Sequence, residues 1–305
     1  MGFLREIKLN GSVYAMFVPV AVLLFLFSYM PMAGVIIAFK DFDFTKGIFG
    51  SEWANPIWNN FDYLLTSSQA LRAIRNTILL NLLFIAVGLG FEVGLALLLH
   101  EIRSKAFKRT AQSITFLPFF ISWIVVGVFL YNLLQYDHGA FNELLKWLGA
   151  DKIDFYNSPG WWPLILVLIM RWKFTGYGTI LYLAGLVSID SSYYEAAAID
   201  GASRWKQIRY ISLPMLKPTM IILTLLAIGR ILNADFGMFY ALVGDAPMLF
   251  ATTDVVDTFV YRSLRETGDI SMASASGFLQ SIVAFLLVLG SNAVARKVDR
   301  DSALF

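Results

Sequence analysis

Cysteine is absent from the 305-residue sequence, and histidine occurs only at His100 and His138. The lack of cysteine excludes disulfides, thiolate metal sites and cysteine nucleophiles, and two histidines are too few for a metal cluster. The sequence also contains no H-E-x-x-H, no G-x-S-x-G and no G-x-x-x-x-G-K-[ST] motif, which argues against a metalloprotease, a serine hydrolase and a P-loop nucleotide site. We therefore expect no catalytic residue, no metal and no cofactor in this chain.

Charge is scarce as well. Only 15% of the residues are charged, whereas 58% are hydrophobic and the mean hydropathy is +0.65. The net charge of +2 is too small to suggest nucleic-acid binding. A soluble protein this apolar would lack enough polar surface, so we expect lipid to surround most of the chain.

Six apolar segments are long enough to cross a bilayer core of roughly 30 Å. Because lipid offers backbone groups no hydrogen-bonding partner, we predict an all-α membrane protein with six transmembrane helices in one domain over residues 1–305. The first segment is too long for a cleaved signal peptide. The predicted helices cover residues 12–39, 76–99, 111–134, 160–187, 218–243 and 272–295, with a cytoplasmic loop over 188–217.

The distribution of Lys and Arg sets the predicted orientation. Six spans place both termini on one side, and short loops on that side are rich in positive charge, so both termini are expected in the cytoplasm. The cations on that side are Arg5, Lys8, Arg103, Lys105, Lys108, Arg109, Arg204, Lys206, Arg209, Lys217, Arg296, Lys297 and Arg300.

The loop over residues 188–217 has the pattern of two short helices joined at a glycine. Ser191 and Ser192 are candidate N-caps, and Glu195 falls in the first turn. Gly201 can adopt a backbone conformation that ends one helix and begins a turn. Trp205, Ile208 and Ile211 then recur at helical spacing. These apolar residues need the underside of the membrane or another protein.

This loop resembles the EAA motif of ABC-importer permeases, a family with a type I permease fold. The resemblance implies that the loop docks in a cleft of a cytoplasmic ATPase subunit, with Glu195 contacting a basic group and Gly201 forming the corner. Residues outside the loop, such as 116–123 and 254–262, resemble the carbohydrate and polysaccharide branch, which includes lipoprotein-linked saccharide and alginate importers. The matching motif positions are Glu195, Ala196, Ala197, Asp200, Gly201, Ala202, Ile211, Leu213 and Pro214.

Several polar residues interrupt the apolar segments, and charge at membrane depth costs several kcal/mol unless it faces a partner or water. One interpretation is a polar translocation cavity, whose cations would suit an acidic saccharide such as alginate. The alternative is internal pairing, for example of Glu92 with a cation on a neighbouring helix or of Asp235 with Arg230. The candidate pathway residues are Arg171, Lys173, Tyr177, Arg230, Asn233, Asp235 and Tyr240.

The leading hypothesis is a non-catalytic permease subunit of an ATP-driven oligosaccharide importer in a bacterial inner membrane. The resemblance implies two ATPase subunits that bind ATP and magnesium, a second related permease and an extracytoplasmic binding protein. A permease for another substrate class and an ion-coupled carrier remain alternatives. The carrier would use a buried acid such as Glu92 or Asp235 and would not need the Glu195 loop. Transport measured in vesicles would separate the importer from the carrier, since dependence on a co-expressed ATPase favours the importer and dependence on a proton gradient favours the carrier.

Overall fold

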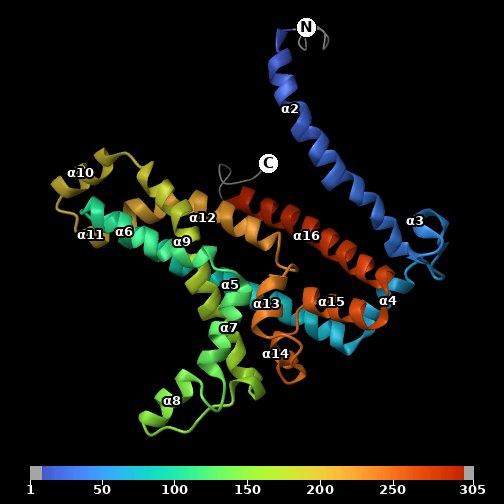
Figure 1. The fold of residues 1–305 in the computed structure, drawn as a ribbon. Helices are drawn as coiled ribbons and strands as arrows, with labels where there is room; N and C mark the ends of the chain where they lie inside the picture. Colours follow the sequence, from blue (N-terminus) through green and yellow to red (C-terminus); the bar gives the residue numbers. More distant parts are fainter. Residues whose placement is uncertain (1–8, 299–305) are drawn as a thin grey trace. The chain divides into compact units, whose positions relative to one another are not determined.

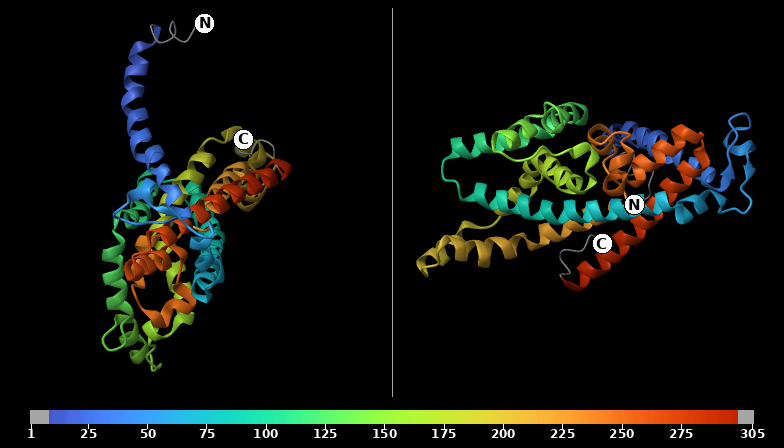
Figure 2. Two further views of the ribbon diagram at one scale, coloured as in Figure 1. Left: turned by 90° about the vertical axis from the view of Figure 1, so that its right-hand side faces the viewer. Right: turned by 90° about the horizontal axis from the view of Figure 1, so that it is seen from below.

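The computed structural model describes residues 9–298. The predicted terminal cations Arg5, Lys8 and Arg300 lie outside this range. Figures 1 and 2 show the ribbon coloured along the sequence. Contacts between residues divide the protein into two units. Unit 1 is formed by residues up to Ser67 together with Val260–Leu279, and unit 2 by Ser68–Phe259 together with the chain from Gln280 onwards.

The first apolar segment belongs to unit 1 and is one helical run with changing pitch. It comprises α2 (Gly11–Leu24), the π-helical turn η1 (Phe25–Tyr29) and the 3₁₀ helix η2 (Met30–Phe39). Pro31 lacks an N–H group, so the α-helical hydrogen-bond ladder cannot continue through it unchanged. The most apolar window of this run has 0% of its residues buried within the chain, so lipid or another subunit must cover it.

A short antiparallel strand pair with two short helices follows this helix in unit 1. Strands β1 (Lys40–Asp41) and β2 (Glu52–Trp53) pair antiparallel, with α3 (Gly47–Gly50) between them and α4 (Asn59–Thr66) after them. The Lys40 ammonium is buried and donates to the carbonyls of Phe49 and Ser51, at 3.0 and 2.9 Å. The buried charge therefore satisfies the backbone of the tight loop that it supports.

Unit 2 is built around two long helices, α5 (Ser68–Glu101) and α9 (Trp162–Val187), which pack along each other. In Figure 2, right, α5 is one unbroken helix, and the segment that contains α12 (Leu213–Ile228) runs beside it. One apolar core contains Leu80, Phe84 and Trp162, and a second contains Val93 and Leu186.

The chain after α5 bends sharply. Helix α6 (Lys105–Phe116) leads through the 3₁₀ turn η3 (Leu117–Phe120) into α7 (Trp123–Leu134), and the two apolar parts meet at 95°. Pro118 cannot donate to the preceding turn, and the Ser122 hydroxyl accepts from Val125 N–H to start the new helix. The predicted segment 111–134 is thus two helices joined at a bend rather than one straight span.

The predicted segment 218–243 also differs in the structure. Its helix begins earlier, with α11 (Arg204–Gln207) and the π-turn η6 (Ile208–Ser212) leading directly into α12. The helix then ends at Ile228, and residues 229–235 are not helical before α13 (Phe236–Leu242). Side chains from three other helices hold the backbone of residues 229–235 in place, and a local sequence pattern could not reveal these tertiary contacts.

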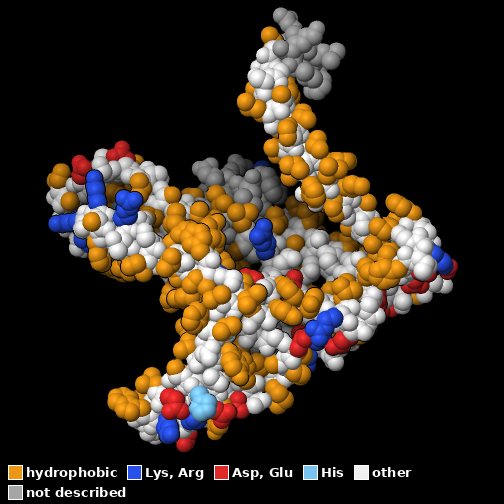
Figure 3. Space-filling view, viewed as in Figure 1, with side chains coloured by type: hydrophobic (Ala, Val, Ile, Leu, Met, Phe, Trp, Pro, Cys, Tyr) orange, Lys and Arg blue, Asp and Glu red, His pale blue; other side chains and the backbone are white. Residues whose placement is uncertain are grey.

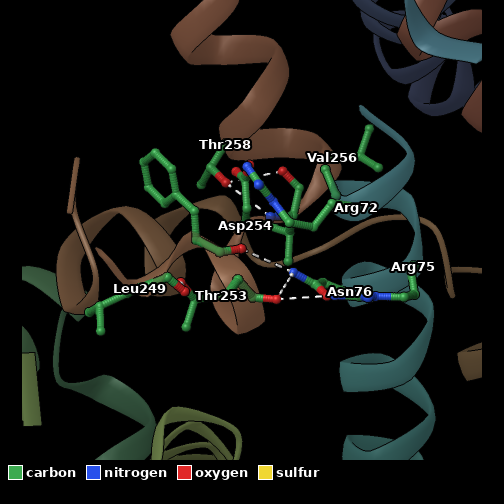
Figure 4. A network of polar contacts seen from close by, with 12 residues as sticks. Arg72, Arg75, Asn76, Leu249, Thr253, Asp254, Val256 and Thr258 are labelled. Carbon is green, nitrogen blue, oxygen red and sulfur yellow. Dashed lines mark hydrogen bonds and ion pairs between the residues drawn. The ribbon is translucent and has the colours of Figure 1, made fainter. Parts of the chain in front are cut away.

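The outer part of unit 2 consists of short elements. Helix α8 (Ala140–Trp147) and the 3₁₀ turns η4 (Phe155–Asn157) and η5 (Pro159–Trp161) precede α9, and η7 (Pro247–Leu249) with α14 (Phe250–Thr253) follows α13. Figure 4 shows how α14 and the chain after it are fastened to α5. Arg72 pairs with the buried Asp254 at 3.3 Å, and the Asn76 amide donates to the Phe250 and Ala251 carbonyls.

Helices α15 (Val256–Thr267) and α16 (Ile270–Val298) complete the described chain, and both run across the boundary between the two units. Five helices are long and apolar enough to cross a membrane, and the bent pair α6 and α7 makes a sixth if it forms one span. The predicted segments 12–39, 76–99, 160–187 and 272–295 each lie within one helical run. The prediction of an all-α membrane protein is confirmed, with β1 and β2 as the exceptions within residues 9–298.

Candidate functional site

The predicted two-helix loop is present as α10 (Ser191–Ile199) followed by α11, with Gly201 between them. The N-cap of α10 is Asp190 rather than Ser191 or Ser192, because the Asp190 carboxylate accepts from Ser192 N–H at 2.9 Å. This backbone bond holds the pKa of Asp190 below its ordinary value. Ser191 instead donates its hydroxyl to the Glu195 carboxylate at 3.1 Å.

Gly201 ends α10 in a left-handed conformation, with φ of 76°. Gly201 N–H donates to Ala198 and Ala202 N–H donates to Ala197, at 3.1 and 2.8 Å. This pair of bonds is a Schellman motif, which satisfies the last carbonyls of a helix and reverses the chain. Ser203 then caps α11 by accepting from Lys206 N–H. The sequence-predicted corner at Gly201 therefore has a defined hydrogen-bonded geometry.

Tertiary bonds hold the two short helices together. The Tyr194 hydroxyl lies 3.0 Å from the buried Ser212 hydroxyl, and the buried Gln207 amide donates to the carbonyls of Tyr194 and Ala202. Sequence reasoning missed Tyr194, Gln207 and Ser212. No local pattern marks them, because their role depends on the way the loop folds back on itself.

The same loop contacts the end of α5. Arg204 pairs with Glu101 at 3.3 Å, and the rings of Tyr194 and His100 lie 5.9 Å apart. Both side chains of this ion pair are partly exposed, so the pair itself contributes little to stability. Its position is what matters, since α5 runs without interruption from the loop to the polar residues deeper in unit 2.

The predicted motif residues do not all lie together. Glu195, Gly201 and Ala202 line a groove between α10 and α11. Ala196, Ala197 and Asp200 lie beside them on α10 and at its end, whereas Ile211, Leu213 and Pro214 lie farther along the helix that enters the apolar layer. Figure 3 shows Lys and Arg side chains gathered over the α10 and α11 end of unit 2. Ile199, Trp205 and Tyr210 are 87%, 66% and 69% exposed there.

A polar cavity of about 270 Å³ lies between α5, α9 and the end of α12. Three of the seven predicted pathway residues line it, namely Arg171, Arg230 and Asn233. Sequence reasoning had not proposed Asn81 or Thr224, which also line it. Each is a polar residue with two apolar residues on either side in its helix, and this local isolation was the available signal for finding them.

Glu92 and Arg171 form an ion pair across α5 and α9 in the wall of this cavity. The Arg171 Nη1 atom donates to the Glu92 Oε1 atom at 2.9 Å, and the side chains are only 8% and 19% exposed for Arg171 and Glu92. A Cβ atom at Gly88 would overlap Arg171, and one at Gly178 would overlap Glu92. Each helix thus provides a glycine opposite the partner's charge. The predicted alternative of Glu92 paired with a neighbouring cation is correct.

The break over residues 229–235 forms another wall of the cavity. Its carbonyls accept from side chains of other helices: Asn81 donates to Ile231 and Asn233 at 2.8 and 3.2 Å, and Gln280 donates to Leu232 at 2.9 Å. Ala234 N–H donates to Asp257 at 2.8 Å. Non-helical backbone at membrane depth requires such partners and is typical of transporter helices that line a substrate path.

Lys173 does not line this cavity. Its ammonium is buried and donates to the carbonyls of Pro118, Phe119 and Ile121, with the Trp123 ring centroid 5.1 Å away. These carbonyls belong to the bend between α6 and α7, where the helix ladder stops. Lys173 therefore supplies hydrogen bonds to the bend, and its assignment to the pathway is not supported by the cavity.

Asp235, Tyr177 and Tyr240 also lie outside the cavity lining. Asp235 caps α13 by accepting from Met238 N–H at 3.1 Å, and it accepts from Trp123 Nε1 at 2.8 Å, so the suggested pairing with Arg230 is wrong. Tyr177 stacks on Phe119 with centroids 4.7 Å apart, and Tyr240 stacks on Phe236. These three residues make structural contacts in this chain.

The two-helix loop, the broken helix and the six apolar segments are features of an importer permease. The chain belongs to the family of binding-protein-dependent transport system inner membrane components, whose family model matches residues 86–302. It is a permease of a carbohydrate ABC importer. This finding decides against the ion-coupled alternative.

Individual relatives and a solved structure match nearly the whole chain. The chain is similar to Protein LplB of Bacillus subtilis (strain 168), with 34% identity over 99% of this chain and 93% of LplB. It is 35% identical to the polygalacturonan/rhamnogalacturonan transport system permease protein YteP of the same organism, over 94% of this chain and 88% of YteP. A chain in the crystal structure of a bacterial alginate ABC transporter, in complex with alginate pentasaccharide-bound periplasmic protein, matches with a TM-score of 0.87 and 33% identity. That match covers 97% of this chain and 98% of that chain.

Proposed function

We propose that this permease forms half of an oligosaccharide pathway and receives its driving force from a separate ATPase through α10, Gly201 and α11. ATP and magnesium would bind in that ATPase, present in two copies, and this chain would catalyse no reaction. A second related permease would form the other half of the pathway, and an extracytoplasmic binding protein would deliver the saccharide. Both termini would lie in the cytoplasm, on the side of the loop.

The exposed apolar side chains of the loop support docking. Ile199, Trp205 and Tyr210 are mostly exposed on a segment whose backbone is fully organised by caps and a Schellman corner. Large exposed apolar residues beside a charged rim are typical of protein interaction surfaces. The exposed Glu195 carboxylate, bonded only within the loop to Ser191 among the contacts of residues 9–298, would face a basic group of the ATPase.

The contacts between the loop and α5 support the transmission of movement. Arg204 with Glu101, and Tyr194 with His100, join the loop to the end of α5. The same helix carries Asn81 and Glu92 at the cavity. If α10 and α11 move as the ATPase closes, α5 would carry that movement to the cavity wall. This would be a two-state change biased from a distant site.

Gly201→Ala tests the docking proposal, and the chain provides a matched control in Gly149→Ala. The two glycines have φ of 76° and 78°, and an added Cβ would meet nothing within 4 Å at either position. Both substitutions should therefore cost about 1–2 kcal/mol in local conformational strain. Gly201→Ala should greatly reduce co-purification of the ATPase subunit with the permease from membranes, and Gly149→Ala should not.

Glu195→Lys provides a second test with little effect on folding, because the side chain is exposed. Reversal of this charge should also release the ATPase while the chain still inserts in the membrane. If the ATPase remained bound to both Gly201→Ala and Glu195→Lys permeases at the wild-type level, the loop would not be the docking site.

A further inference from the structure

The charges around the polar cavity do not cancel. Glu92, Arg171 and Arg230 are the charged residues that line it. Glu92 and Arg171 neutralise each other through their bond at 2.9 Å. This leaves the cavity with one net positive charge, which belongs to Arg230.

Arg230 has no ion pair and its guanidinium makes no hydrogen bond within residues 9–298, and it is exposed. Two further acids, one in the broken segment and one bonded to it, have other partners. Asp235 accepts from Trp123 and from Met238 N–H, and Asp257 accepts from Ala234 N–H. Neither acid lines the cavity. A guanidinium left without a carboxylate in an apolar layer is costly unless water or a ligand meets it.

Other helices hold the backbone that follows Arg230. Arg230 is the second residue of the broken segment 229–235, and the carbonyls that follow it accept from Asn81 and Gln280. The backbone next to Arg230 is therefore held by side chains of α5 and α16. Arg171 has a further donor here, because its buried Nε atom has no acceptor within the described part of the chain.

We propose that Arg230 is a carboxylate-binding subsite and that the permease selects oligosaccharides that contain uronic acid units. A guanidinium binds a carboxylate through two parallel hydrogen bonds, whereas a neutral sugar offers it only hydroxyl groups. Asn233 and Thr224, which line the same cavity, offer an amide and a hydroxyl to sugar hydroxyls. This inference rests on the proposed function, since it requires the cavity to be part of the substrate path.

The cavity volume of about 270 Å³ is slightly below the roughly 300–1,000 Å³ of typical small-molecule pockets. One chain would therefore hold only part of an oligosaccharide. A single cation in a cavity of this size would bind one acidic group at a time as the saccharide passes.

Because the chain contains no cysteine, a single introduced thiol can report the potential in the cavity. Ala227 lines the cavity and is small, so Ala227→Cys is the reporter. The assembled transporter in membrane vesicles is treated with an anionic sulfonatoethyl or a cationic trimethylammonium-ethyl methanethiosulfonate reagent, and the mass of this chain is followed. Trp147→Cys, at a side chain that is 81% exposed on α8, reports the intrinsic rates of the two reagents.

The reporter should react several-fold faster with the anionic than with the cationic reagent, relative to Trp147→Cys. Adding Arg230→Gln should lower this ratio by about fivefold or more, and Arg230→Lys should retain it. Trigalacturonate should slow labelling of the reporter, galactotriose should not, and the protection should disappear with Arg230→Gln. An unchanged ratio in Arg230→Gln, or equal protection by the acidic and the neutral trisaccharide, would overturn the carboxylate subsite alone.

A different result would contradict the assignment of this cavity to the substrate path. If the Ala227→Cys thiol reacted with neither reagent in any nucleotide state, while Trp147→Cys reacted normally, the cavity would not open to water. That result would overturn the assignment of this cavity to the substrate path, and the carboxylate subsite with it. The docking of the ATPase at the loop would be unaffected.

Discussion

The bend at residues 117–122 and the break at residues 229–235 interrupt apolar helices in two different ways. At the bend, carbonyls accept from the buried cation of Lys173. At the break, carbonyls accept from the neutral amides of Asn81 and Gln280, while the cation Arg230 stays exposed in the cavity. Both regions meet the requirement that backbone groups in an apolar layer find a partner.

The difference shows why an isolated cation in an apolar segment has no fixed meaning. A cation that donates its hydrogen bonds to backbone carbonyls is not available to a ligand. Where neutral amides donate to the carbonyls instead, a nearby cation remains available. Trp123 joins the two regions, since its ring lies against Lys173 and its Nε1 donates to Asp235. A movement at one interruption of the helices can therefore reach the other through a single side chain.

Lys173→Met should give the largest effect, because it removes the donor to three carbonyls of the bend. Each unsatisfied buried group costs about 1–3 kcal/mol, so we expect a loss of about 3 kcal/mol or more. The midpoint of thermal unfolding of the purified complex measures it. Arg230→Gln is the matched control and should stay within about 0.5 kcal/mol of wild type. Equal midpoints for the two variants would remove the distinction between the bend and the break.

Asn81→Leu should have an intermediate effect, because it removes the amide that donates to Ile231 and Asn233. We expect a loss of about 1–3 kcal/mol and a matching fall in ATP-dependent saccharide uptake by proteoliposomes. Asn132→Leu is the control, since that exposed amide donates to Val128 in its own helix. The role of Asn81 in holding the break would be refuted if the two variants had the same stability and uptake.

Asp257→Asn should have the smallest effect on stability, and it should change how the stability depends on pH. Burial raises the pKa of Asp257 above its ordinary value of 3.8, and the nearby Asp235 acts in the same direction. The folded state therefore holds this proton more tightly than the unfolded state, so the contribution of Asp257 is most favourable below about pH 4 and declines as pH rises through the folded-state pKa. Asparagine keeps an oxygen for Ala234 N–H but does not titrate.

Unfolding midpoints of the wild type and Asp257→Asn between pH 4 and 7 check this expectation. The variant should gain stability relative to wild type as pH rises, by about 1 kcal/mol or less. A constant difference across this range would mean that Asp257 does not titrate differently in the folded protein.

Much of the architecture could be predicted from the sequence. The apolar segments, the glycine corner at Gly201 and the helical spacing of Trp205, Ile208 and Ile211 are local patterns, and the structure has helices and a turn at those places. The two interruptions were not predicted. At the first, the presence of Pro118 alone does not determine the angle through which the chain bends. Residues 229–235 have no proline at all, and their break depends on Asn81, Asp257 and Gln280, which are distant in sequence.

The candidate cavity shows the same limit. Arg171, Lys173 and Arg230 are equivalent as sequence features, since each is a cation among apolar neighbours. Pairing with Glu92 accounts for the first and carbonyls of the bend account for the second, whereas the third has no such partner within residues 9–298. The partner of a charge is a long-range property that composition and periodicity do not contain.

The sequence by itself determined that this chain is a helical membrane protein with a two-helix loop of the EAA type, because hydropathy, helix period and glycine conformations are local properties. Only the tertiary structure decided which helices are interrupted and which cation remains for a ligand. Backbone and charged groups removed from water must find partners, and those partners come from helices that the chain brings together only when it folds.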